Sequence, residues 1–223
     1  MHRMATLDPD GFVGTSVYSM GVQARILFLG AEDCHVIVVG PTGSGKLVVT
    51  RLIHAAWGRG GLVRVAAAQL EGGPMRSELF GAIRGAYTGA DRDRKGFVEL
   101  AHGGILVIDD ADDWSPALQL FLLDVAEQVA LWPVGVGRSY LANLRIIVCV
   151  QTPPEQLVRE GRWRPDLLYR LDQERLTLLP LGEHLEDLPA LAAHALARGA
   201  AARGVRAPVL APAALRGLKA CGW

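Results

Sequence analysis

Residues 35–57 read HVIVVGPTGSGKLVVTRLIHAAW, and this stretch decides the fold class. His35–Val39 is a short β-branched run that predicts a buried strand. Apolar residues at helical spacing over Lys46–Trp57 predict an amphipathic helix. A glycine-rich turn that ends in a lysine joins the two segments. A strand, a glycine-rich loop and a helix in this order are the context that a phosphate-binding loop requires.

The loop predicts a nucleotide site because its glycines allow successive backbone N–H groups to face phosphates, and the helix N-terminus adds its positive dipole end. We expect Lys46 to reach the β and γ phosphates of ATP. Leu47 stands where the general pattern has Ser or Thr, so the hydroxyl that would hold magnesium is absent from that position. The alternative is a plain strand-to-helix turn with a solvated lysine. The predicted nucleotide-binding residues of the loop are Gly40, Pro41, Thr42, Gly43, Ser44, Gly45, Lys46 and Leu47.

A second segment, GGILVIDD at residues 103–110, predicts the other half of such a site. Its four apolar residues form a buried strand, and the two carboxylates emerge at the edge where α/β sheets bind ligands. We expect Asp109, as part of the nucleotide site, to bind magnesium directly or through water. We expect Asp110 to polarise the attacking water. The alternative is that the acidic residues simply begin a loop, since Asp112 and Asp113 follow.

The rest of the chain predicts an α/β fold with a mostly parallel sheet flanked by helices. Further strands are expected at 62–66, 105–108, 144–150 and 175–179, separated by helical patterns or long loops. Ser115 and Pro116 predict the start of a helix. Its apolar stripe consists of Leu118, Leu122, Val125 and Val129. After Pro180 the pattern becomes helical, which predicts a partial C-terminal lid. We therefore divide the chain into a tail at 1–11, an α/β nucleotide-binding domain at 12–180 and the lid at 181–223.

Composition narrows the function class. Lys plus Arg and Asp plus Glu are equal at 23 each, so no basic excess predicts a nucleic-acid surface, and we expect no direct DNA binding within this chain. Cys34, Cys149 and Cys221 lack the paired spacing of metal or redox motifs, which favours free thiols. The N-terminus has no apolar segment typical of a secretion signal, and no stretch reaches the roughly 18 apolar residues of a membrane span. We expect a cytoplasmic protein without membrane contact.

Two further segments carry a resemblance to a known family. Between the nucleotide motifs lies SELFG at 77–81, followed by the hexapeptide GAYTGA at 85–90. From residue 40 to residue 223 the chain resembles the AAA+ domains of sigma-54-dependent bacterial transcription activators, which carry GAFTGA in an inserted loop. Tyr87 replaces the family's phenylalanine and keeps an aromatic ring. Residues 160–171, EGRWRPDLLYRL, are similar to the family's arginine-finger segment.

The resemblance implies that ATP hydrolysis moves the loop against sigma-54 RNA polymerase at a promoter and so activates transcription. It also implies a ring of subunits, a hexamer. Arg164 and Arg170 match the family's two arginines that approach the neighbouring subunit's nucleotide, and the alternative is surface pairing with Asp166 or Asp172. The alternative for the loop is a surface hairpin with Tyr87 folded onto the core. By resemblance, the residues that contact sigma-54 are Gly85, Ala86, Tyr87, Thr88, Gly89 and Ala90.

Several positions depart from the family's pattern, and they touch hydrolysis rather than nucleotide binding. Asp110 replaces the family's glutamate, and Ala66 falls where an asparagine restrains that glutamate. The Thr-Asn pair of the sensor strand falls on Val150 and Gln151, and an Arg-Glu-Arg segment before the lid reads GEH at 182–184. Two hypotheses follow. The chain is an ATPase, active or weakened, that works as a ring, or it is a hydrolysis-impaired ATP-binding module.

Overall fold

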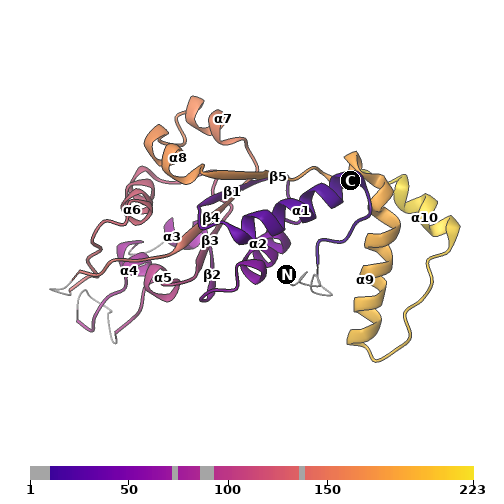
Figure 1. Cartoon of the computed structure of the whole chain (residues 1–223), viewed down its shortest axis with the longest axis horizontal. Coiled ribbons are helices and arrows are strands. Elements are labelled where there is room, and N and C mark those ends of the chain that lie inside the picture. The colour runs from indigo at the N-terminus through magenta and orange to yellow at the C-terminus, as the bar shows by residue number, and fades with distance from the viewer. Residues whose placement is uncertain (1–10, 72–74, 86–92, 136–138) are drawn as a thin grey trace.

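The computed structural model describes residues 11–71, 75–85, 93–135 and 139–223. A five-stranded parallel sheet in the order β2-β3-β4-β1-β5 forms its centre (Figure 1). The strands are β1 (Val36–Val39), β2 (Leu62–Ala66), β3 (Ile105–Asp109), β4 (Arg145–Val150) and β5 (Glu174–Thr177). Every residue of β1, β3 and β4 is buried, as expected for strands that are covered on both faces. The predicted α/β fold is confirmed.

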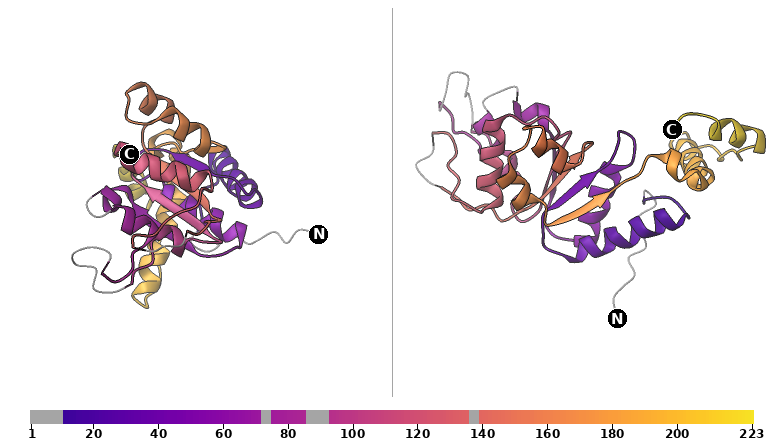
Figure 2. Two further views of the ribbon diagram at one scale, coloured as in Figure 1. Left: turned by 90° about the vertical axis from the view of Figure 1, so that its left-hand side faces the viewer. Right: turned by 90° about the horizontal axis from the view of Figure 1, so that it is seen from above.

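Helices cover both faces of the sheet, and a helical segment follows it (Figures 1 and 2). One face packs against α1 (Val17–Ala31) and α2 (Lys46–Trp57). The other face packs against α3 (Ala67–Glu71), α4 (Met75–Phe80), α5 (Phe97–Leu100), α6 (Pro116–Ala126), α7 (Pro154–Arg159) and α8 (Pro165–Leu171). Beyond β5 come two 3₁₀ turns, η1 (Leu181–Glu183) and η2 (Leu185–Asp187), then α9 (Leu188–Ala202) and α10 (Pro212–Lys219). In the described part of the chain, no helix is both long and apolar enough to cross a membrane.

Two expectations about helices need correction. The helix that begins after Ser115 ends at Ala126, and Val129 lies beyond it with 44% of its surface exposed. Gln128 has a φ of 54°, a left-handed conformation that stops the helix before that residue. The second correction concerns α1, because the sequence patterns above did not predict a helix at this position. Its signals were an N-cap, Ser16, whose side chain accepts from the Ser19 amide, and buried residues at helical spacing.

Asp187 ties the start of α1 to the segment before α9. This buried carboxylate accepts hydrogen bonds from the backbone amides of Thr15 and Ser16 at 2.6 and 2.7 Å. It also accepts from the hydroxyls of Ser16 and Ser19 at 2.5 and 2.6 Å. Burial alone would raise the pKa of Asp187, but these hydrogen bonds outweigh it and hold the pKa well below its ordinary value. The helical segment is therefore anchored to the α/β unit, while the exact division at residues 11 and 180 stays a prediction.

Candidate nucleotide-binding site

The glycine-rich loop has the backbone that a phosphate-binding loop needs. Gly43 and Gly45 have φ values of 84° and 94°, which glycine adopts without the strain that a side chain would bring. Gly45 is the N-cap of α2, and Lys46 is its first residue. The loop therefore turns tightly into a helix N-terminus that faces the carboxyl edge of the sheet, where α/β folds bind anions.

Lys46 is buried against its own loop. Its ammonium donates to the carbonyl oxygens of Gly40 at 2.7 Å and Pro41 at 3.1 Å. These contacts hold the amine at the loop, from which rotation of its flexible stem can carry it to a phosphate. The hydroxyl of Ser44 is buried, and among the described residues it has no hydrogen-bond partner. A buried polar atom without a partner is costly, so it fits a site that is completed by a ligand.

The structure brings the two sequence motifs together. Thr42, Gly43, Gly45, Lys46, Leu47, Val48, Asp109 and Asp110 line one cavity of about 320 Å³. The loop follows β1 and the aspartates follow β3, two strands separated by β4, so their meeting is a result of the sheet order. Beside it, a cavity of about 270 Å³ lies between the loop, the segment around Phe12 and helix α9, which contributes Leu191 and His194. The sequence reasoning did not identify this second cavity, whose apolar lining suits a nucleotide base.

Asp109 is not free for a metal ion in this structure. Its carboxylate is buried, and Arg64 of β2 donates to it at 2.7 Å. Leu47 supplies no hydroxyl and Asp109 is held by Arg64, so neither of the two oxygen ligands expected for magnesium is available in this arrangement. Burial also raises the pKa of the neighbouring Cys149 thiol to about 12, and the charge of Asp109 acts in the same direction. The thiol stays neutral and offers no alternative ligand.

The backbone of Asp110 is strained. Its φ is 52°, a left-handed conformation that costs a residue with a side chain on the order of 1 kcal/mol. The residue is exposed and lines the cavity of the loop, which is the place expected for a group that polarises water. Gln151, the sensor-position residue that follows β4, accepts a hydrogen bond from the hydroxyl of Thr42 at 3.1 Å. The departure at Gln151 therefore contacts the phosphate loop directly.

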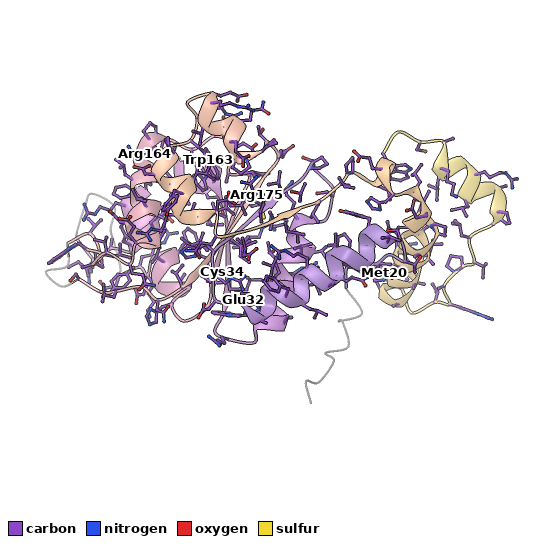
Figure 3. All side chains as sticks on the ribbon, turned by 45° about the horizontal axis from the view of Figure 1, so that its top comes forward. Met20, Glu32, Cys34, Trp163, Arg164 and Arg175 are labelled. Carbon is purple, nitrogen blue, oxygen red and sulfur yellow. The ribbon has the colours of Figure 1, made fainter. Side chains whose placement is uncertain are left out.

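The two candidate finger arginines lie away from this chain's own cavity. Arg164 precedes α8 and pairs with Asp166 at 2.5 Å, as the alternative hypothesis expected. Arg170, in the last turn of α8, pairs with Glu127 at 2.9 Å rather than with Asp172. In the described lining of the 320 Å³ cavity neither arginine occurs. Figure 3 shows Arg164 beside Trp163 on the side of the molecule that carries α7 and α8.

A buried glutamine, which sequence reasoning missed, holds the backbone around Arg164. Gln119 of α6 accepts from the Arg164 amide at 2.7 Å and donates to the carbonyl of Arg162 at 2.8 Å. It also donates to the carbonyl of Trp114 at 3.1 Å, and Trp114 stacks on Trp163 with ring centroids 4.8 Å apart. The segment that follows Asp110 is thus packed against the segment that presents Arg164. A glutamine inside an apolar helix gives no pattern from which this role could be read.

The hexapeptide GAYTGA lies mostly outside the described residues. Gly85, its first residue, has a φ of 78°, and positions 86–90, which include Tyr87 and Thr88, are not described. The base of the segment is closed by the bridge between Ala82 and Arg94 and by an ion pair of Arg94 with Glu78 at 2.5 Å. A side chain at Gly81, whose φ is 88°, would meet the Arg94 carbonyl at 2.7 Å. The base therefore fixes where the hexapeptide leaves the domain.

Comparison with known proteins places the chain in a family. Residues 13–177 match the family model described as the sigma-54 interaction domain. The chain belongs to this family. It is 33% identical over 216 residues to the Nif-specific regulatory protein of Herbaspirillum seropedicae, which covers 96% of this chain and 40% of that protein. It is 35% identical to the C4-dicarboxylate transport transcriptional regulatory protein DctD of Rhizobium meliloti, over 100% of this chain and 49% of that protein. The chain spans less than half the length of either relative.

Solved structures agree with the fold. A crystal structure of NtrX from Brucella abortus in complex with ADP has a TM-score of 0.85 and 29% identity, covering 97% of this chain and 48% of that chain. The same protein in complex with ATP gives a TM-score of 0.83 at 29% identity, over 97% of this chain and 47% of that chain. The sequence-based assignment to the sigma-54 activators and to the AAA+ P-loop fold is thus confirmed.

Proposed function

We propose that this chain is an ATP-binding sigma-54 interaction domain that couples ATP hydrolysis to the remodelling of sigma-54 RNA polymerase. The observation that carries the proposal is the 320 Å³ cavity in which Lys46 and both motif aspartates meet. Family membership supports it, as do the ADP and ATP complexes of the similar NtrX protein. Lys46 and the loop amides bind the phosphates, and Asp110 orients the attacking water. Hydrolysis is slow because an aspartate replaces the usual glutamate.

Two parts of the chain that do not line the described cavity, the two arginines and the hexapeptide, have further roles in this function. Arg164 and Arg170, on the α7 and α8 side, reach the nucleotide of a neighbouring subunit in a ring, which by family resemblance is a hexamer. There they stabilise charge on the transferring phosphoryl group. The hexapeptide at 85–90, held by the closed base at Ala82 and Arg94, contacts sigma-54. The task of the arginines requires assembly, because neither arginine lines the described part of its own chain's cavity.

A second candidate function is a nucleotide-binding module that does not hydrolyse ATP. The ion pair between Arg64 and Asp109 favours it, since it occupies the carboxylate that would otherwise take part in catalysis. The shorter carboxylate of Asp110 acts in the same direction. The two functions differ in turnover and agree on binding, so binding is the first test of either one.

Lys46→Ala is the direct test of nucleotide binding. The variant removes the only side-chain ammonium of the loop, and charge-assisted contacts to phosphate are worth about 1.5–3 kcal/mol each. We therefore expect ATP affinity to fall by at least about tenfold in calorimetry. Lys95→Ala, which removes an exposed lysine paired with Glu99 instead, is the matched control and should leave the affinity unchanged. Equal ATP binding by the wild type and Lys46→Ala would contradict the proposal.

A further inference from the structure

Asp109, the last residue of β3, forms an ion pair with Arg64 of β2. Arg64 lies two residues before Ala66 on β2, and Ala66 is the register partner of Asp109. Residues two apart on a strand share a face, so the Arg64 side chain is the diagonal neighbour of Asp109 on the α2 side of the sheet. The methyl group of Ala66 leaves the path between them open. The resulting contact joins Nη2 of Arg64 to Oδ2 of Asp109 at 2.7 Å.

The surroundings make this pair more than an ordinary surface contact. The Asp109 side chain is only 8% exposed, whereas 55% of the Arg64 side chain reaches solvent. A buried carboxylate without a partner would repel a polyphosphate in the adjacent cavity, which Asp109 itself lines. In a P-loop site a bound Mg²⁺ ion ordinarily removes this repulsion, helped by the hydroxyl that follows the lysine. Here that position is Leu47, and the guanidinium already neutralises the carboxylate.

We propose that Arg64 takes the neutralising role of the metal ion beside Asp109, so that this chain binds metal-free nucleoside di- and triphosphates about as tightly as their magnesium complexes. This inference rests on the proposed nucleotide site and specifies its ligand. It follows from the pair of charges and from the missing hydroxyl together. Arg64 acts here as a positioning residue, through Asp109 and not by contact with the nucleotide.

Calorimetric titration measures the dissociation constant of ATP in excess Mg²⁺ and, separately, in a chelator. The effect is the ratio of the constant in the chelator to the constant in Mg²⁺. For the wild type we expect a ratio below about tenfold. In Arg64→Ala the buried carboxylate is left unpaired, and we expect the ratio to rise well above the wild-type value because Mg²⁺ is then needed to offset the repulsion. In the double variant Arg64→Ala, Asp109→Asn both charges are gone, so the ratio should return to the wild-type value.

Two controls separate this effect from loss of fold. Arg64→Lys keeps a cation and should keep the wild-type ratio. Arg59→Ala removes an exposed arginine that pairs with Asp33, in the turn between α2 and β2, and should also leave the ratio unchanged. A wild-type ratio of tenfold or more, or an Arg64→Ala ratio equal to that of the wild type, would overturn the inference. A wild type that binds ATP in neither condition would instead overturn the proposed nucleotide site, and the inference with it.

Discussion

At the end of β3, two adjacent aspartates meet different surroundings. Asp109 is buried and ion-paired, while Asp110 is exposed on a left-handed backbone. Sequence reasoning assigned different roles to these two residues from their order alone. It did not foresee Arg64, because the ion pair joins positions 45 residues apart and depends on the register of β2 against β3.

Asp110→Glu tests whether carboxylate length limits hydrolysis. Aspartate is one methylene shorter than glutamate, which withdraws its carboxylate from the attacking water by about one carbon–carbon bond, and a misplacement of about 1 Å can cost about 10²-fold in rate. We expect Asp110→Glu to raise turnover with little change in ATP affinity, because Lys46 and the loop amides carry binding. Steady-state hydrolysis in an assembled preparation measures this. Turnover no faster than that of the parent would place the defect elsewhere, at Gln151 or at the Arg64 pair.

His35 predicts a loss of stability on mild acidification. Burial lowers the pKa of its imidazole from 6.5 to about 4, and the charges of Arg145 and Arg170 act in the same direction. The ring nitrogen Nδ1 accepts a hydrogen bond from the Ile146 amide at 3.1 Å, a contact that protonation would break. Because the folded-state pKa is lower than the unfolded one, the unfolded chain takes up the proton first, and stability falls as pH drops from about 6.5 towards about 4.

His35→Asn provides the matched comparison for this titration, since its amide oxygen can accept the same hydrogen bond without taking up a proton. We expect the thermal midpoint of the wild type to fall more steeply than that of the variant between pH 6.5 and pH 4.5. The depressed pKa of Asp187 stabilises the fold, and most of this contribution is lost only below about pH 4; it is present in the wild type and in the variant, so it does not affect their comparison. Parallel pH profiles would contradict the assignment.

At the scale of elements, the hexapeptide segment leaves the domain from a closed and geometrically constrained base. Gly81 permits the chain to pass the Arg94 backbone. The Arg84 amide donates to the Asp93 carboxylate at 2.8 Å, which joins the two ends of the segment. This constrained base supports the proposed role of the hexapeptide at 85–90.

Thr88→Ala is the variant that isolates the tip. The change removes one hydroxyl and one methyl group at a position outside the described residues, far in sequence from the phosphate loop. We expect it to abolish capture of sigma-54 by the chain in the presence of a non-hydrolysable ATP analogue, with ATP affinity unchanged. Pull-down with purified sigma-54 measures the first and calorimetry the second. If the variant still captures sigma-54, the hexapeptide is not the contact.

Most elements could be predicted from the sequence, and the exceptions have physical causes. The strands β2 and β4 were expected within one residue of their observed bounds. A nearly continuous apolar run marks the buried β4, whereas the partly buried β2 is marked by its β-branched residues. The helix α2 was expected at its observed limits, since glycines mark both its ends. The missed α1 has buried residues at helical spacing, but Leu27 and Phe28 on its outer side are also apolar, which obscured the period. Gln119 and Arg64 depend on tertiary contacts that no local pattern encodes.

For the whole molecule, the separation between the cavity and the two arginines is the feature that matters most. A nucleotide bound by Lys46 in one subunit needs an arginine from elsewhere if a finger is to act on it. Gln119 and the stacked Trp114 and Trp163 connect the end of β3 to the backbone of Arg164 in the same chain. In the proposed ring, these contacts would let the state of one nucleotide site influence the Arg164 side chain that faces the next subunit. An isolated chain should be nearly inactive.

Steady-state ATP hydrolysis per subunit, measured across the protein concentrations over which light scattering shows assembly, tests the central claim most directly. We expect the rate per subunit to rise as the chain assembles, and we expect Arg164→Ala to remove the rise while ATP binding persists. An arginine that acts in this way can be worth about 10³-fold or more in rate, so the loss should be large. A rate per subunit that stays constant through assembly, or an Arg164→Ala variant as active as the wild type, would contradict it.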